Sequence, residues 1–357
     1  MPAPPSSHTR AIALWLFACA AMVFVMVALG GVTRLTESGL SITLWQPVTG
    51  ILPPLNEAQW QDAFAAYKSI PQYQAIHAGM SLADFKTIYF WEWFHRLWGR
   101  LIGVVFLLPF LYFLARRQIP RSLAPSLALL FVLGALQGVL GWWMVASGLE
   151  DRIEVSQYRL AAHLAAAIVI YLAILWVALD LVRPAGGAGK TKDHPPSCLK
   201  HGADLALLLG FVTLVAGAFV AGLRAGLIDN TFPLMDGHWI PPAWDNLSPW
   251  WRNLFENPEA VQFDHRLLAA LTWLVSLALF LGTFLYRPLL PRIAMGAVHS
   301  LFTLTSLQAG LGIACLLLAV PLDLALAHQL GATLVLTAAL VARHVLGGTR
   351  KTPPAGL

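Results

Sequence analysis

Charged residues are scarce in this 357-residue sequence, in which Asp, Glu, Lys and Arg together make up 11% of the chain. Hydrophobic residues make up 58% and the mean hydropathy is +0.67, which excludes an ordinary soluble globular protein. Cysteine is also rare, and because Cys19, Cys198 and Cys315 share no motif spacing, we expect no disulfide framework. The composition is typical of a polytopic membrane protein.

Eight apolar segments are long enough to cross the hydrocarbon core of a bilayer, which requires about 20 helical residues. They cover residues 11–31, 89–115, 123–146, 158–182, 204–227, 262–286, 292–319 and 322–346. Because an open sheet edge would leave unpaired backbone groups in lipid, we expect an all-α fold. The first segment is longer than a signal-peptide core, and we interpret it as a membrane span.

Lys and Arg predict the orientation, because short basic loops stay in the cytoplasm. With both termini cytoplasmic, that face carries Arg10, Arg116, Arg117, Arg121, Arg183, Lys190, Lys192, Lys200, Arg287, Arg292, Arg343, Arg350 and Lys351. The net charge of +5 therefore indicates membrane topology, and we expect a lipid bilayer and no nucleic acid as a partner.

The two halves of the sequence resemble each other. Residues 94–97 (FHRL) recur as 264–267 (DHRL), 136–141 (LQGVLG) as 307–312 (LQAGLG), and 162–163 (AH) as 327–328 (AH). The repeat predicts two parallel four-helix bundles. The expected units are residues 1–182 with a long outer loop at 32–88, a cytoplasmic linker at 183–203, and residues 204–357 with an outer loop at 228–261.

The two outer loops have different patterns. In the first, aromatic residues recur at helical spacing between 56 and 70, which predicts an amphipathic helix over the mouth of the bundle. The second is rich in Pro and Trp, and we expect an ordered cap whose aromatic side chains reach the lipid headgroups. A simple aromatic belt remains the alternative for these tryptophans.

Four histidines lie near the outer ends of spans, two in each half: His95, His163, His265 and His328. Two helices that each present an imidazole can clamp a porphyrin iron, so the pairs predict one heme in each half. A single histidine in such a place is more often a hydrogen-bonded core residue, but the matched depth and the duplication favour ligation. Zinc or copper is the competing interpretation, although such sites usually have three or four clustered donors.

Heme propionates require cationic partners near the membrane boundary. The candidates at the outer helix ends are Arg34, Arg96, Arg100, Arg159, Arg224 and Arg266. Alternatively, some of them extend toward lipid headgroups.

The halves differ one turn before the first histidine of each pair. Glu92 precedes His95 by three residues, whereas Gln262 takes the same place before His265. An ionisable group at membrane depth is a functional candidate, so Glu92 is the predicted catalytic residue. The alternative is that its carboxylate offsets the helix dipole or caps the first turn.

On these residues the sequence resembles the heme A synthase family over almost its whole length. The matching runs are residues 30–36 (GGVTRLT), 45–50 (WQPVTG), 53–54 (PP), 92–100 (EWFHRLWGR), 231–235 (TFPLM) and 262–266 (QFDHR). The resemblance implies oxidation of the C8 methyl of heme O to the formyl group of heme A, by successive hydroxylations and loss of water. It also implies that His265 and His328 ligate a resident heme b, and that His95 and His163 hold heme O or heme A.

Some family members carry a cysteine pair in the first outer loop, which this sequence lacks, so no redox role of such a pair applies. The sequence is more similar to the mitochondrial and proteobacterial type, and its short leader favours a bacterial inner membrane with heme sites toward the periplasm. We expect a heme O synthase and an electron donor as partners, and homo-oligomerisation remains open. Two other functions also remain open, a di-heme b-type quinol or electron-transfer cytochrome and a heme transporter or chaperone.

Overall fold

The computed structural model describes residues 7–47, 49–150, 152–182 and 195–347, which form helices and no β-strand. Within these ranges eight helices are long and apolar enough to cross a membrane. They are α1 (Ser7–Leu35), α4 (Leu82–Ala115), α5 (Ala124–Ala146), α6 (Gln157–Val182), α7 (Ser197–Gly222), α9 (Pro258–Leu285), α10 (Arg292–Leu317) and α11 (Leu322–Leu346). The prediction of an all-α polytopic membrane protein is confirmed.

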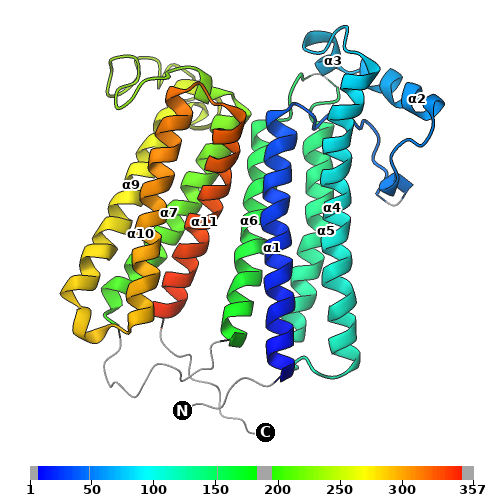
Figure 1. The fold of residues 1–357 in the computed structure, drawn as a ribbon. Coiled ribbons are helices and arrows are strands. Elements are labelled where there is room, and N and C mark those ends of the chain that lie inside the picture. Colours follow the sequence, from blue (N-terminus) through cyan, green and yellow to red (C-terminus); the bar gives the residue numbers. More distant parts are fainter. Residues whose placement is uncertain (1–6, 48, 151, 183–194, 348–357) are drawn as a thin grey trace.

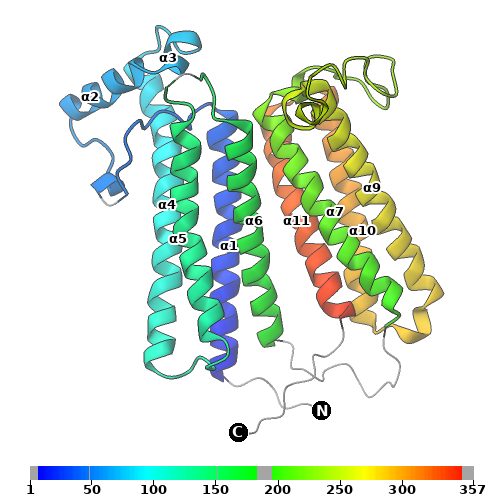
Figure 2. The same ribbon diagram turned by 180° about the vertical axis from the view of Figure 1, so that it is seen from behind.

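The eight spans stand in two groups, α1, α4, α5 and α6 in one and α7, α9, α10 and α11 in the other (Figures 1 and 2). The groups meet where α1 and α6 pack on α11 and α7. Apolar side chains fill this contact, with Val27, Ile168, Leu214 and Leu336 buried between the groups. The grouping follows the sequence halves, whereas their relation as parallel repeats stays a prediction.

The apolar segment at 89–115 predicts a helix that starts at residue 89, but helix α4 is longer. The helix begins at Leu82, after Ser81, whose hydroxyl accepts a hydrogen bond from the backbone N–H of Asp84. Asp84 and Lys86 make these first turns polar, so hydropathy does not detect them. At about 1.5 Å per residue the helix is about 51 Å long, and it extends well beyond a hydrocarbon core of about 30 Å.

The protruding start of α4 carries a small domain built from α2 (Glu57–Lys68) and α3 (Pro71–Ala75). Phe64 and Tyr67 on α2 are buried and stack on Phe85 of α4, with ring centres 4.8 and 5.4 Å apart. The amphipathic helix predicted between 56 and 70 is therefore present. It lies beside this end of α4 and not across the mouth of the bundle (Figure 1).

Helix α7 differs in position from the predicted span at 204–227. It begins at Ser197, inside the expected linker, of which residues 183–194 lie outside the described residues. It ends at Gly222. Two residues later Arg224 adopts a left-handed backbone conformation with φ of 52°, and a right-handed α-helix cannot continue through such a residue. The short elements are η1 (Thr49–Ile51), η2 (Ala225–Leu227), η3 (Trp250–Arg252), α8 (Asn253–Glu256) and η4 (Arg287–Leu289).

The second outer loop is ordered by asparagine side chains. Asn253 donates to the carbonyls of Leu247 and Trp250, and Asn257 donates to the carbonyl of Ala243 and caps α9. Trp239 and Trp250 are 75% and 73% exposed, as the prediction of outward-facing aromatic residues requires. Their contact with lipid stays a prediction.

Candidate functional site

The four histidines lie on four different spans, at the same end of each group of helices. His95 is on α4 and His163 on α6, while His265 is on α9 and His328 on α11. In the second group the rings of His265 and His328 have centres 6.3 Å apart and lie nearly perpendicular, with an angle of 86° between their planes. Two metal–imidazole bonds of about 2.0 Å each would place the ring centres about 6 Å apart across one shared ion. By this spacing, His265 and His328 would be able to hold one iron between them.

Each histidine ring packs against a glycine on a neighbouring span. An added Cβ on these glycines would lie 2.6 to 3.2 Å from the imidazole Cε1 in the pairs Gly30–His95, Gly141–His163, Gly217–His265 and Gly312–His328. A side chain on Gly141 or Gly312 would overlap the ring and displace it, and one on Gly30 or Gly217 would push the ring by a few tenths of an ångström, because the optimal distance between carbon atoms is about 3.5–4.0 Å. These glycines therefore leave the imidazoles free to turn toward the middle of their group.

Two glutamines hold the helices that carry the second histidine of each pair. Gln137 Nε2 donates to the carbonyl of His163 at 2.6 Å, and Gln308 Nε2 donates to the carbonyl of His328 at 2.8 Å. Gln308 Nε2 also lies 3.0 Å from Nδ1 of His328. Neither glutamine was predicted to have a role. Each lies four residues before a glycine of the repeat, Gly141 or Gly312, and this recurrence could have identified both glutamines.

The pairs differ in how firmly their first ring is held. His265 Nδ1 donates to the carbonyl of Thr213 at 3.0 Å, which leaves its Nε2 with a free lone pair. In contrast, the Nδ1 atoms of His95 and His163 are buried and have no hydrogen-bond partner among the described residues. The second pair is thus the more rigidly oriented of the two.

Glu92 is 3% exposed and its carboxylate is fully engaged. It accepts hydrogen bonds from Ser41 Oγ and Ile42 N, both at 2.8 Å, and from Arg96 at 2.5 Å. Glu92 therefore ties the first outer loop to the helix that carries His95.

Gln262 occupies the matching place with the opposite polarity. It accepts from Arg266 at 2.8 Å but donates to the carbonyl of Ala225 at 2.7 Å. The first loop offers donors to residue 92, whereas the second offers a carbonyl to residue 262. The difference between Glu92 and Gln262 follows from this loop polarity without any requirement for catalysis. Glu92 lies well inside α4, which begins at Leu82, so a first-turn cap or an offset helix dipole does not explain the carboxylate.

Five of the six predicted propionate-binding arginines donate to backbone carbonyls, and Arg34 is one of them, with Ala221 as its partner. Arg96 donates to Ile42 and Leu44, Arg266 to Asp229 and Thr231, Arg100 to Gln46 and Pro47, and Arg159 to Trp143. Nη1 of Arg100 and Nε of Arg266 remain buried without a partner among the described residues. Buried unpaired donors are rare, so these two atoms fit an anionic group such as a carboxylate.

Arg34 and Arg224 share the carboxylate of Glu154, and the ion pairs of Arg224 join the two groups. Arg34 contacts Glu154 at 2.6 Å, and Arg224 contacts both Glu154 and Glu37. Burial alone would lower the pKa of Arg224, but the adjacent Glu154 and Glu37 raise its pKa above the ordinary value. These two cations already have carboxylate partners from the protein itself.

The described residues contain no group of three or more His, Cys, Asp or Glu side chains arranged to hold a metal ion. This fits a porphyrin better than zinc or copper, because the porphyrin itself supplies the remaining ligands of the iron. Cys19, Cys198 and Cys315 are all unpaired, as the sequence predicts.

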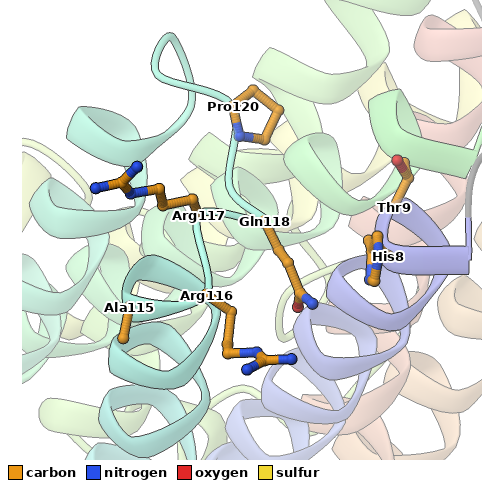
Figure 3. Close-up of a pocket in the computed structure, with 7 residues that line it drawn as sticks. All are labelled: His8, Thr9, Ala115, Arg116, Arg117, Gln118 and Pro120. Atoms are coloured by element: carbon orange, nitrogen blue, oxygen red, sulfur yellow. The ribbon is translucent and has the colours of Figure 1, made fainter.

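A hollow of about 600 Å³ lies between the start of α1 and the end of α4, at the end of the bundle that is opposite to the histidines (Figure 3). His8, Arg116 and Gln118 point toward the space between the two helix ends, whereas Arg117 points away from it. From His8 to Gly30 the helix covers about 33 Å, so this hollow is distinct from the histidine sites. It belongs to the basic face that the sequence assigns to the cytoplasm.

Comparison with known proteins identifies close relatives. The family described as "Cytochrome oxidase assembly protein" matches residues 13–340. The chain is 50% identical over 338 residues to a protein named Heme A synthase from Nitrosospira multiformis, covering 94% of both chains. It is 53% identical over 340 residues to a Heme A synthase from Rhodopseudomonas palustris, strain TIE-1, covering 94% of this chain and 89% of the relative. A Heme A synthase from Rhodospirillum centenum is 53% identical over 344 residues, with coverage of 95% and 89%.

Proposed function

The chain belongs to the cytochrome oxidase assembly protein family, and on that premise we propose that it is a heme A synthase, a membrane oxidoreductase that acts on heme O. Its substrate is heme O and its product is heme A, which carries a formyl group in place of the C8 methyl. The observation that best supports a porphyrin chemistry is the 6.3 Å spacing of the His265 and His328 rings.

The second pair holds a resident heme b in this proposal. His265 is oriented by the carbonyl of Thr213, while Gln308 binds the backbone carbonyl of His328 and lies 3.0 Å from its Nδ1, so protein contacts hold both residues. The unpaired Nε of Arg266 is available to a propionate. When bound, the heme supplies one-electron chemistry.

The first pair holds the substrate. His95 and His163 lack hydrogen bonds at Nδ1, which suits a site that must accept heme O and release heme A, because a ring that is ordered only on binding holds its ligand less tightly. Arg100 offers a buried unpaired donor to a propionate. The first outer loop covers this region and is held in place by Glu92, Arg96 and Arg100.

Glu92 keeps its place as the catalytic candidate, because it is the ionisable side chain one helical turn from His95. Its hydrogen bonds to Ser41, Ile42 and Arg96 give it a positioning function in addition. Either function makes the first pair dependent on the carboxylate. Unfolding measurements of the Glu92→Gln variant distinguish the catalytic function from the positioning function.

Pigment analysis tests the proposal. Protein expressed with a heme O supply should contain heme O or heme A together with heme b, and the His265→Ala variant should lose the heme b while its helices still insert. The His95→Ala variant should instead keep heme b and make no heme A. The His299→Ala variant serves as control, because His299 bonds only to Thr283 on the far part of the second group.

Two other outcomes would replace the proposal. Heme b alone at both pairs would identify a di-heme electron-transfer cytochrome. The structure supports this function more than the sequence does, because the polarity of the two loops explains the difference between Glu92 and Gln262 without catalysis. Variable and substoichiometric heme would indicate a transporter or chaperone.

The proposal extends to location and partners. The end of the bundle opposite the histidines carries Arg116, Arg117, Lys200, Arg287 and Arg292, which supports a cytoplasmic assignment for that face and a periplasmic one for the histidines. In a bacterial inner membrane, a heme O synthase would supply the substrate and a separate donor the electrons. Labelling of single cysteines placed in the loop after α4 and in the loop after α7 tests this orientation.

A further inference from the structure

Helix α11 connects the two histidine sites through consecutive residues. His328 faces α10, where it packs against Gly312. The next residue, Gln329, faces the other group of helices and donates from Nε2 to the carbonyl of Val27 on α1 at 2.8 Å. This hydrogen bond therefore joins the second site's helix to α1.

Helix α1 has a matching pair of consecutive glycines. A Cβ on Gly31 would lie 2.8 Å from Gln329 Oε1 and 2.9 Å from Leu326 Cδ1, so a side chain at this position would displace the amide of Gln329. A Cβ on Gly30 would lie 3.2 Å from His95 Cε1. Successive residues of a helix point about 100° apart, so one turn of α1 contacts both sites.

The other half of the chain does not have this hydrogen bond. Alignment of residues 162–163 with 327–328 places Leu164 opposite Gln329. Leu164 packs in the apolar contact between the groups, beside Ile168 and Leu214. Since an apolar side chain fills the equivalent place, packing alone does not require the amide of Gln329.

We propose that Gln329 is a positioning residue that fixes the His328 helix against the segment of α1 that packs on His95, so that the two sites hold one relation to each other. A polar side chain between helices in lipid forms a hydrogen bond because no water competes for it. The inference rests on the proposed function only in that each pair carries a heme.

The Gln329→Leu variant tests this inference, because it copies the residue of the other half. Its matched control is Thr337→Val, which removes a hydrogen bond of 2.8 Å between Thr337 and Tyr171 that also joins α11 to the first group, farther from both sites. Both variants are compared with wild type in thermal unfolding, heme content, and redox titration of the two pigments. The titration uses protein loaded with heme A, whose conjugated formyl group separates its absorption from that of heme b.

We expect Gln329→Leu to keep both hemes but to shift the midpoint potential and absorption maximum of the pigment at the first pair, whose ligands it does not touch. The yield of heme A should fall about threefold, the factor that one inter-helix hydrogen bond in a membrane is worth. Thr337→Val should change neither pigment. Gly31→Ala, which blocks the approach of Gln329, should reproduce the Gln329→Leu spectrum.

An unchanged first-pair pigment in Gln329→Leu would overturn the inference, and so would an equal shift in Thr337→Val. A wild-type protein without heme at the histidine pairs would instead remove the proposed function. The two failures are therefore distinguishable in one set of preparations.

Discussion

Glu92→Gln separates a positioning function of the carboxylate from a chemical one. The wild-type side chain accepts from Ser41 Oγ, Ile42 N and Arg96, whereas glutamine has one acceptor oxygen and brings an amide N–H₂ against at least one of these donors. A hydrogen bond to a charged group contributes about 1.5–3 kcal/mol, so the loss of one and the weakening of the others should cost about 2–4 kcal/mol of unfolding free energy.

The assay is thermal or denaturant unfolding of the purified protein, together with heme A yield. Ser41→Ala is the graded control, because it keeps the carboxylate and removes one donor, at a cost of about 1 kcal/mol. Gln262→Glu is the matched control in the other half, since it places a carboxylate against the carbonyl of Ala225 and should destabilise as well. If Glu92→Gln unfolds like wild type and loses only heme A formation, the positioning account is wrong and the carboxylate acts on the reaction itself.

Three further predictions concern the glycines, a loop aspartate and the ion pairs. Gly141→Val should remove pigment from the first pair by displacing His163, whereas Gly138→Val should retain it, because nothing lies within 4 Å of a Cβ there; spectra of the purified variants test this. Burial, and next Glu259, raise the pKa of Asp229, so its ionised form weakens the fold. Asp229→Asn should therefore raise the unfolding temperature at neutral pH, and the gain should vanish below about pH 4, where the unfolded carboxyl is also protonated. Glu154→Gln removes the shared partner of Arg34 and Arg224 and should cost about 1 kcal/mol at low salt and less at high salt, as salt-dependent unfolding would show.

The sequence predicts the spans well because each is a long apolar run, but it places some ends poorly. The first turns of α4 contain Asp84 and Lys86, and they stay helical because Ser81 caps the helix and Phe85 packs against α2. The end of α7 depends on the left-handed conformation of Arg224, which hydropathy does not report. Boundaries of this kind are set by tertiary contacts and by single backbone conformations.

The candidate site shows the same division. The repeat of His265 and His328 with His95 and His163 predicts the pairs, and the ring centres of the second pair lie 6.3 Å apart. Ligation by these pairs stays a prediction. The partners of the arginines could not be predicted, because Arg34 meets Glu154 from a loop 120 residues away. Loop polarity around Glu92 and Gln262 likewise depends on backbone atoms that no side-chain pattern encodes.

The shared carboxylate of Glu154 also determines which surfaces can associate. The first half contributes Arg34, Glu37 and Glu154 to this contact and the second contributes Arg224, so the local charges are −1 and +1. Two copies of the first half would bring surplus negative charges together, and two copies of the second would bring surplus positive charges together. These charges therefore favour contact between the two unlike groups over contact between like ones.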